Sequence, residues 1–109
     1  MLLSTTSSLD GKTIKEYRGI VFGEVISGIN FMKDFTASIT NFTGGRASEY
    51  EEDLVKSRAD AINEMIDRAQ KIGANGLIGV NVDVESITVG EQGQIMIMVV
   101  ATGTAVVIE

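Results

Sequence analysis

Three stretches of the chain carry apolar residues in patterns that are typical of β-strands. They run from Ile14 to about Ser27, from Leu77 to Val89 and from Gln94 to Ile108. The first and the third are apolar on both faces, so we expect the first strand to be covered on each side. Residues 90–93 predict a hairpin loop between the second and third strands.

The second of these strands is apolar on one face only. Its apolar face contains Ile78, Val80, Val82 and Val84, and its polar face contains Asn81, Asp83 and Glu85. This alternation predicts a half-buried strand with a polar stripe.

Two helices are predicted between the first and second strands. The first begins at Asn30 as a cap, ends at Gly44-Gly45 and carries Phe31, Phe35, Ile39 and Phe42 on one side. The second begins at the capping box Ser48-Glu49-Tyr50-Glu51 and ends at Gly73. Its expected buried stripe contains Tyr50, Leu54, Ala61, Met65, Ala69 and Ile72, flanked by Val55, Ile62 and Ile66.

Together these elements predict a single α+β domain over residues 1–109. A small sheet of three long strands packs against two helices, in the order strand, helix, helix, strand, strand. The helices cover only one face of that sheet, which leaves Met and Val side chains of the last strand open to water on the other face. Because exposed apolar patches mark interfaces and unprotected strand edges can pair, we expect a homo-oligomer.

The composition excludes several kinds of chemistry. The chain has no Cys, His, Pro or Trp, so it offers no disulfide framework, no thiolate nucleophile and no imidazole as a general base or metal ligand. Fifteen acidic and nine basic residues give a net charge of −6, without a cluster of Lys and Arg. We therefore expect no nucleic-acid partner.

We also expect no membrane partner. The longest apolar run, Ile95 to Ala101, has seven residues, whereas a bilayer span requires roughly 20. Residues 1–4 lack the basic and apolar regions of a secretory signal. The expected location is therefore the cytoplasm.

A series of motifs extends over nearly the whole chain. It comprises Thr5-Thr6, Leu9, Gly11, Ile14, Tyr17, Gly19, Val21, Gly23-Glu24, Asn30, Asp34-Phe35, Ala37-Ser38-Ile39, Gly44-Gly45-Arg46, Tyr50-Glu51, Gly73-Ala74-Asn75, Ile78 to Asp83 and Gly103 to Val106. In these motifs and their order, the chain resembles the YbjQ-like family of small bacterial proteins.

The resemblance implies an α+β subunit of unknown function that assembles into a ring, with a pentamer favoured. It also brings a provisional label of heavy-metal binding. Members of the family often have Asp where this chain has Asn75 and Asn81. Since Cys and His are absent, the only soft metal ligands left are methionines, namely Met32, Met65, Met96 and Met98.

The polar stripe of Asn81, Asp83 and Glu85 is the first candidate site. Neighbouring members of the stripe lie about 6 to 7 Å apart on one strand. Their oxygen atoms could hold a hard divalent cation, particularly where copies from adjacent subunits converge. The alternative interpretation, which we favour, is a solvated strand face or a strip of hydrogen bonds between subunits.

Glu24 is the second candidate, because it is a charged residue between Phe22 and Ile26 on one strand face. A buried carboxylate needs a partner, so we expect an ion pair with Arg18, Arg46 or a Lys. If the chain has a general acid or base, Glu24 is the first choice.

Arg46 is the third candidate. It follows two glycines immediately before the predicted second helix, and a helix N-terminus of this kind can hold an anion. We favour a plain turn and helix cap, because four carboxylates crowd the same helix end. Met96 and Met98 form a further pair on one strand face that could bind Cu(I), although methionine more often packs in a core or an interface.

Two classes of binding function follow from these residues. The first is a homo-oligomeric ligand-binding or scaffold protein with sites at subunit interfaces, in which Glu24, Arg46 and Asn81 contact a small molecule. The second is a metal-binding protein in which Asp83 and Glu85, with Glu51 as a further ligand, hold a divalent ion.

The third class is a carboxylate enzyme. In this hypothesis Glu24 or Asp34 works with Tyr17 or Arg46, but nothing in their spacing names a reaction. A protein without enzyme activity is therefore the favoured expectation.

Overall fold

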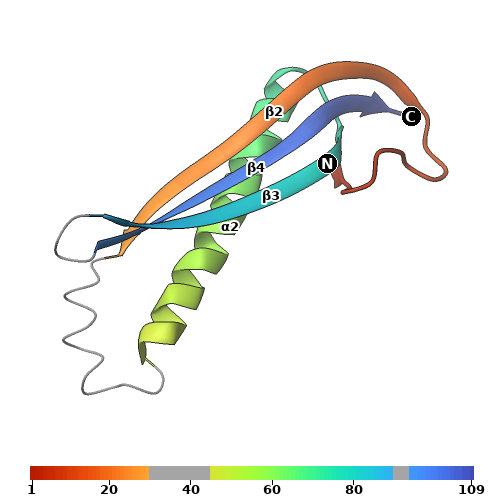
Figure 1. The fold of residues 1–109 in the computed structure, drawn as a ribbon. Helices are drawn as coiled ribbons and strands as arrows, with labels where there is room; N and C mark the ends of the chain where they lie inside the picture. Colours follow the sequence, from red (N-terminus) through yellow and green to blue (C-terminus); the bar gives the residue numbers. More distant parts are fainter. Residues whose placement is uncertain (30–44, 90–93) are drawn as a thin grey trace.

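A computed structural model of the chain describes residues 1–29, 45–89 and 94–109. These residues form two layers, a twisted sheet and a single long helix that lies across one of its faces (Figure 1). In chain order the elements are β1 (Leu2–Leu3), β2 (Ile14–Ile29), α2 (Gly45–Lys71), β3 (Gly76–Val89) and β4 (Gln94–Ile108).

The sheet is mixed, with the strand order β1-β3-β4-β2. Strand β4 lies between β3 and β2 and is antiparallel to both, while the short β1 is parallel to β3. Within residues 1–29, 45–89 and 94–109, β2 is therefore an edge strand along its whole length. On the other side of the sheet, β1 and the residues that follow it pair with β3 only as far as Val80, through the hydrogen bond from Val80 N to Ser4 O.

The prediction of three strands packed against two helices is wrong for the described residues, which contain four strands and one helix. The additional strand β1 was missed because two residues are too few to show a period. The first predicted helix, from Asn30 to Phe42, lies outside the described residues. This structure of one chain does not show the ring that the resemblance implied.

The three long strands and the second helix were predicted close to their observed bounds. Helix α2 begins at Gly45, three residues before the predicted capping box, so Gly45 and Arg46 are helical residues rather than parts of a preceding turn. It ends at Lys71, and Gly73 follows in the left-handed conformation that commonly terminates helices. No helix among the described residues is long and apolar enough to cross a membrane.

The core lies between α2 and one face of the sheet, which we call the covered face. Three residues of the predicted helical stripe, Ala61, Met65 and Ala69, are completely buried, as are Ile97 and Val99 of β4. The predictions for Val55 and Ile72 are wrong, because these side chains are 48% and 40% exposed. The polar Ser57, for which no prediction was made, is buried.

Gly23 is the point at which the helix comes closest to the sheet. A Cβ atom at this position would lie 1.8 Å from the carbonyl oxygen of Ala61 and 2.7 Å from the amide nitrogen of Met65. The backbones of α2 and β2 can therefore approach each other only because the strand has glycine here.

A β-bulge at Gly79 determines which side chains of β3 face the helix. Between Ile78 and Asn81 the strand advances three residues, while its partner advances two, from Thr104 to Thr102. Gly79 adopts a positive φ of 59°, a conformation that glycine reaches without steric cost. The prediction that Ile78 shares a face with Val82 and Val84 is therefore wrong, since the bulge places it on the face of Asn81.

The open face of the sheet as a candidate functional site

The face of the sheet opposite α2, which we call the open face, brings together side chains from three strands. The register places Phe22, Glu24 and Ile26 of β2 beside Thr102, Val100 and Met98 of β4. The same β4 residues pair on their other side with Asn81, Asp83 and Glu85 of β3. The other members of the open face are Tyr17, Ile20, Gly28, Ile78, Ile87, Met96, Thr104 and Val106, of which Ile78 and Val106 are buried.

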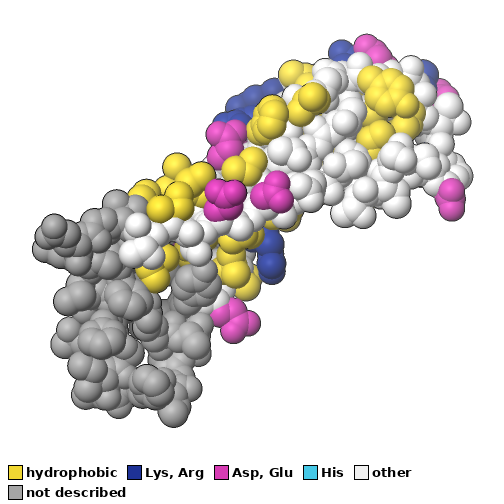
Figure 2. Space-filling view, viewed as in Figure 1, with side chains coloured by type: hydrophobic (Ala, Val, Ile, Leu, Met, Phe, Trp, Pro, Cys, Tyr) yellow, Lys and Arg dark blue, Asp and Glu magenta, His cyan; other side chains and the backbone are white. Residues whose placement is uncertain are grey.

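Large apolar side chains on the open face are exposed to solvent. The exposed fraction is 70% for Ile20 and 64% for Ile26, and Tyr17, Phe22 and Ile87 are also exposed. Figure 2 shows hydrophobic side chains in a band along the strands, with acidic side chains between them. Among the described residues, α2 covers only the face of β2 that carries Val21 and Gly23, so the predicted cover on the second face of β2 is not present in that part of the protomer.

The candidate residues of β2 and β3 share this face although they are far apart in the sequence. Asp83, Val100 and Glu24 form one row across the three strands, which puts Glu24 and Asp83 roughly 10 Å apart, two interstrand spacings. Asn81 donates a hydrogen bond from Nδ2 to Oδ2 of Asp83 at 3.1 Å. The next row places Glu85 beside the half-buried Met98.

Within residues 1–29, 45–89 and 94–109, no three or more Asp and Glu side chains are grouped so that they could hold a metal ion. The chain also lacks Cys and His, the ligands that soft and borderline metals prefer. Asp83 and Glu85 would therefore need further ligands from another copy. Glu51, the third predicted ligand, lies on α2 in the other layer of the molecule.

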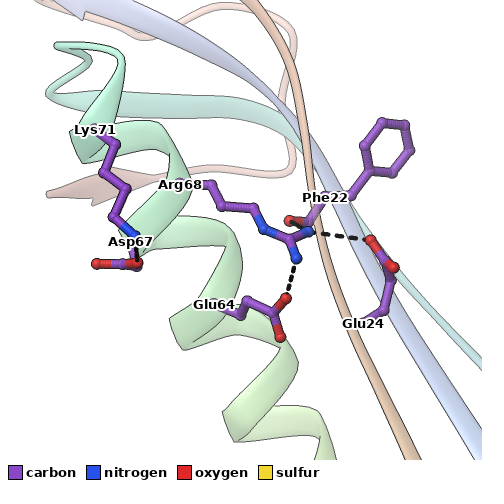
Figure 3. A network of polar contacts seen from close by, with 6 residues as sticks. All are labelled: Phe22, Glu24, Glu64, Asp67, Arg68 and Lys71. Carbon is purple, nitrogen blue, oxygen red and sulfur yellow. Dashed lines mark hydrogen bonds and ion pairs between the residues drawn. The ribbon is translucent and has the colours of Figure 1, made fainter.

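The partner of Glu24 is a residue that sequence analysis did not identify. Nη1 of Arg68 lies 3.1 Å from Oε1 of Glu24 and also donates to the carbonyl oxygen of Phe22 at 2.8 Å (Figure 3). Nη2 of the same guanidinium donates to Glu64, one helical turn earlier. The predicted partner Arg18 pairs with Glu16 instead.

Among the candidate partners of Glu24 in the enzyme hypothesis, only Tyr17 has a described side chain. Arg46 lies in the first turn of α2, and its side chain falls outside the described positions, as does Asp34. Tyr17 pairs with Val106 and Glu24 with Val100, so about 20 Å of strand separates the two rows. The proposed catalytic pairing of Glu24 with Tyr17 is therefore not formed in this chain.

The methionines are divided between the two faces. Met65 is completely buried in the core under α2, whereas Met96 and Met98 lie half-buried on the open face. Met32 lies outside the described residues. Among the described residues, Met96 and Met98 are therefore the methionines that could form a thioether metal site on the open face of one copy.

Lys56, on the outer side of α2, has a raised pKa. Its ammonium group donates a hydrogen bond to Oδ2 of Asp60 at 2.9 Å, and this bond together with the negative charge of Asp60 raises the pKa of the Lys56 side chain. Such i,i+4 pairs stabilise helices modestly. The pair does not belong to the open face.

Asn75 has a structural role that sequence analysis did not predict. Its Nδ2 donates to the carbonyl oxygen of Ile108 at 2.9 Å, and its Oδ1 accepts from the amide of Ile108 at 2.7 Å. The Asn75 side chain thus forms with the backbone of Ile108 the pair of hydrogen bonds that a neighbouring strand would form at the end of β4. Only an amide can make both bonds, because a carboxylate has no proton to donate.

Comparison with known proteins places the chain among small bacterial proteins. The family model that matches residues 1–109 is described as "Putative heavy-metal-binding". A UPF0145 protein from Acetivibrio thermocellus is 53% identical over 109 residues, which are 100% of both chains. A UPF0145 protein from Listeria monocytogenes is 52% identical over all of this chain and 96% of its own length.

One solved structure resembles the fold over its whole length. It is the crystal structure of a protein of unknown function from the DUF74 family, from Pediococcus pentosaceus. The TM-score is 0.55 at 18% sequence identity, and the match covers 100% of this chain and 98% of the other. At this identity the similarity concerns the fold alone.

Proposed function

Because this chain belongs to the YbjQ-like family of uncharacterised UPF0145 proteins, we propose its function from the open face: it is a homo-oligomeric ligand-binding or scaffold protein. The second copy packs against the open face, and ligand sites lie between copies. The observation that carries this proposal is the exposure of Ile20 and Ile26 on a sheet face that α2 does not cover.

The energetics of burial support a second copy on this face. Complete burial of an Ile or Phe side chain contributes roughly 1.5–3 kcal/mol, and Ile20, Phe22 and Ile26 are neighbours on one face. The shape of the protomer agrees with this, since its radius of gyration is 17.9 Å, against about 13 Å for a compact domain of this length. An elongated chain gains buried surface by association.

The carboxylates on the open face favour a ligand site between copies. Direct face-to-face packing would bring Glu24, Asp83 and Glu85 of one copy against acidic residues of the other, which costs free energy unless a cation or a polar molecule lies between them. Asp83 and Glu85, with Asn81 beside them, are the residues through which such a ligand would be held. A divalent cation and a small cationic molecule are the two classes that fit this chemistry.

The assembly is tested by a matched pair of surface variants. Ile20→Lys places a charge on the open face, and Val55→Lys places the same charge on an exposed apolar position of the helix. Light scattering coupled to size-exclusion chromatography should show a smaller particle for Ile20→Lys only. Equal masses for wild type, Ile20→Lys and Val55→Lys, with all three folded, would contradict the proposal.

The ligand is tested by thermal unfolding with Mg²⁺, Ca²⁺, Mn²⁺ and Zn²⁺ added one at a time, and with spermidine as an organic cation. A ligand at 100 times its Kd stabilises the folded state by about 2.7 kcal/mol. We expect at least one of these to raise the Tm of wild type and not that of an Asp83→Asn, Glu85→Gln double variant. An unchanged Tm with all five would exclude the cation site and leave the scaffold role.

A further inference from the structure

We propose that Arg68 caps the exposed edge of β2 and prevents that edge from pairing with strands of other molecules. This is a protective role for the assembly state and is separate from ligand binding on the open face. It does not rest on the proposed homo-oligomer, because it concerns association beyond the wild-type size, whatever that size is.

The exposed edge of β2 could pair with strands of other molecules and so lead to aggregation. The strand has 16 residues and, among the described residues, pairs only with β4, so the peptide groups on its other side have no strand partner in that part of the chain. Such edges are templates for addition of further strands. Residues 19–26, Gly-Ile-Val-Phe-Gly-Glu-Val-Ile, contain one charge and no Pro, a composition typical of aggregation-prone strands.

The guanidinium of Arg68 forms a hydrogen bond with a peptide carbonyl group on this edge. Its Nη1 donates to the carbonyl oxygen of Phe22 at 2.8 Å, and an incoming strand would need that oxygen as its own acceptor. In an antiparallel edge strand, peptide groups of alternate residues point the same way, so those of Glu24 and Ile26 also point outward. The guanidinium therefore lies in the row of groups that a new strand would pair with.

Two carboxylates hold the guanidinium in this position. Glu24 extends from β2 and Glu64 from α2, and both accept hydrogen bonds from Arg68 (Figure 3). The planar, forked guanidinium can make all three contacts at once, which a Lys ammonium on a flexible stem does less well. Exposed ion pairs of this kind add little stability, so the contact to the strand edge is the feature that requires Arg.

The contact with Arg68 divides β2 into two parts of similar length. Phe22 lies at the middle of β2, with eight residues before it and seven after it. The first part is interrupted by register shifts at Ile14/Glu16 and Tyr17/Gly19, and bulges of this kind hinder edge pairing. The bulges and the Arg68 cap together shorten the regular segments of this edge, and residues 23–29 are the longest that remains.

The test compares Arg68→Gln with Lys71→Gln. Lys71 pairs with Asp67 on the same helix, as Arg68 pairs with Glu64, but it contacts no strand in the described structure (Figure 3). Both variants lose one charge and one i,i+4 pair and keep a residue of high helix propensity. Thioflavin T fluorescence and sedimentable protein are followed over several days, with circular dichroism to confirm that each variant is folded.

We expect Arg68→Gln to form β-rich aggregates at least ten times faster than wild type and Lys71→Gln. Gly79→Ala serves as a control for lost stability, since it weakens β3 without contacting β2, and it should aggregate more slowly than Arg68→Gln. A folded Arg68→Gln with the rate of Lys71→Gln would overturn the proposal.

Should Arg68→Gln not fold, Arg68→Lys decides the question, because it keeps the charge but loses the fork. Aggregation of folded Arg68→Lys faster than that of Lys71→Arg supports the cap. Equal rates for these two variants overturn it.

Discussion

The covered and open faces of the sheet both carry large apolar residues, but the covered face also has a row of small residues under the helix. The covered face contains Gly23 on β2 and Ala101, Gly103 and Ala105 on β4, whereas Ile20, Phe22 and Ile26 project from the open face. The helix also has small side chains where it meets this face, since Ala61 and Ala69 are completely buried on either side of Met65.

This difference explains which face the helix of the same chain covers. A helix can approach a sheet closely only where both surfaces have small side chains, and close approach maximises dispersion contacts. Large branched side chains offer more apolar area but leave the backbone farther away. In this protein, the row of small residues under the helix, together with the charged residues on the open face, distinguishes the face closed within a protomer from the face left for another partner.

The largest expected effect on stability comes from Met65, the large side chain at the centre of the covered face. Met65→Ala leaves a cavity next to Gly103 and should lower the free energy of unfolding by about 4 kcal/mol. Met98→Ala, on the open face, should lower it by about 1 kcal/mol, because that side chain is only half-buried. Urea unfolding at one fixed protein concentration measures both, and similar losses would remove the distinction between the faces.

Gly23→Ala is expected to lower the free energy of unfolding somewhat less than Met65→Ala does. The new Cβ meets backbone atoms of Ala61 and Met65, so the helix must move away, at a cost of about 3 kcal/mol. Gly28→Ala on the same strand serves as the control, because Gly28 is exposed on the open face. If the two variants unfold at the same urea concentration, α2 does not lie against Gly23.

A loss of about 1 kcal/mol is expected for Gly79→Ala, which strains the left-handed residue of the bulge. Nothing lies within 4 Å of the added Cβ, so the cost is conformational. Asn tolerates this conformation better than Ala, and Gly79→Asn should therefore retain more stability. Equal or reversed midpoints for the two variants would indicate that the bulge is absent and the faces of β3 are assigned differently.

The smallest effect is expected for Glu24→Gln on the open face. The ion pair with Arg68 is exposed on both sides, and such pairs are worth less than about 1 kcal/mol. We expect the free energy of unfolding to change by about 0.5 kcal/mol or less. This value applies to the single protomer, so a loss of several kcal/mol at concentrations where the protein is monomeric would contradict the exposure of Glu24. A larger loss in the assembled protein would agree with burial of Glu24 under a second copy.

The regular parts of the fold could be predicted from the sequence because they produce periodic patterns. The strand from Gln94 to Ile108 was predicted with its observed bounds, and Ala61, Met65 and Ala69 were correctly placed in the core. The bulge at Gly79 could not be predicted in this way. An extra residue changes the face of Ile78 without changing the alternation that precedes or follows it.

The candidate site was only partly accessible from the sequence. The polar stripe of β3 and the unusual charge at Glu24 were visible as patterns, but their meeting on one face depends on both strands pairing with β4. Arg68 lies 44 residues from Glu24, and no local pattern links the two. A contact across the edge of a sheet depends on the tertiary arrangement alone.

The mass of the wild-type protein in solution tests the central claim most directly. Sedimentation equilibrium at micromolar concentrations should give a mass of two or more chains of 11.6 kDa each, because the open face is covered by another copy. A single species of 11.6 kDa at every concentration would contradict the claim. The open face would then be a free surface of a monomer.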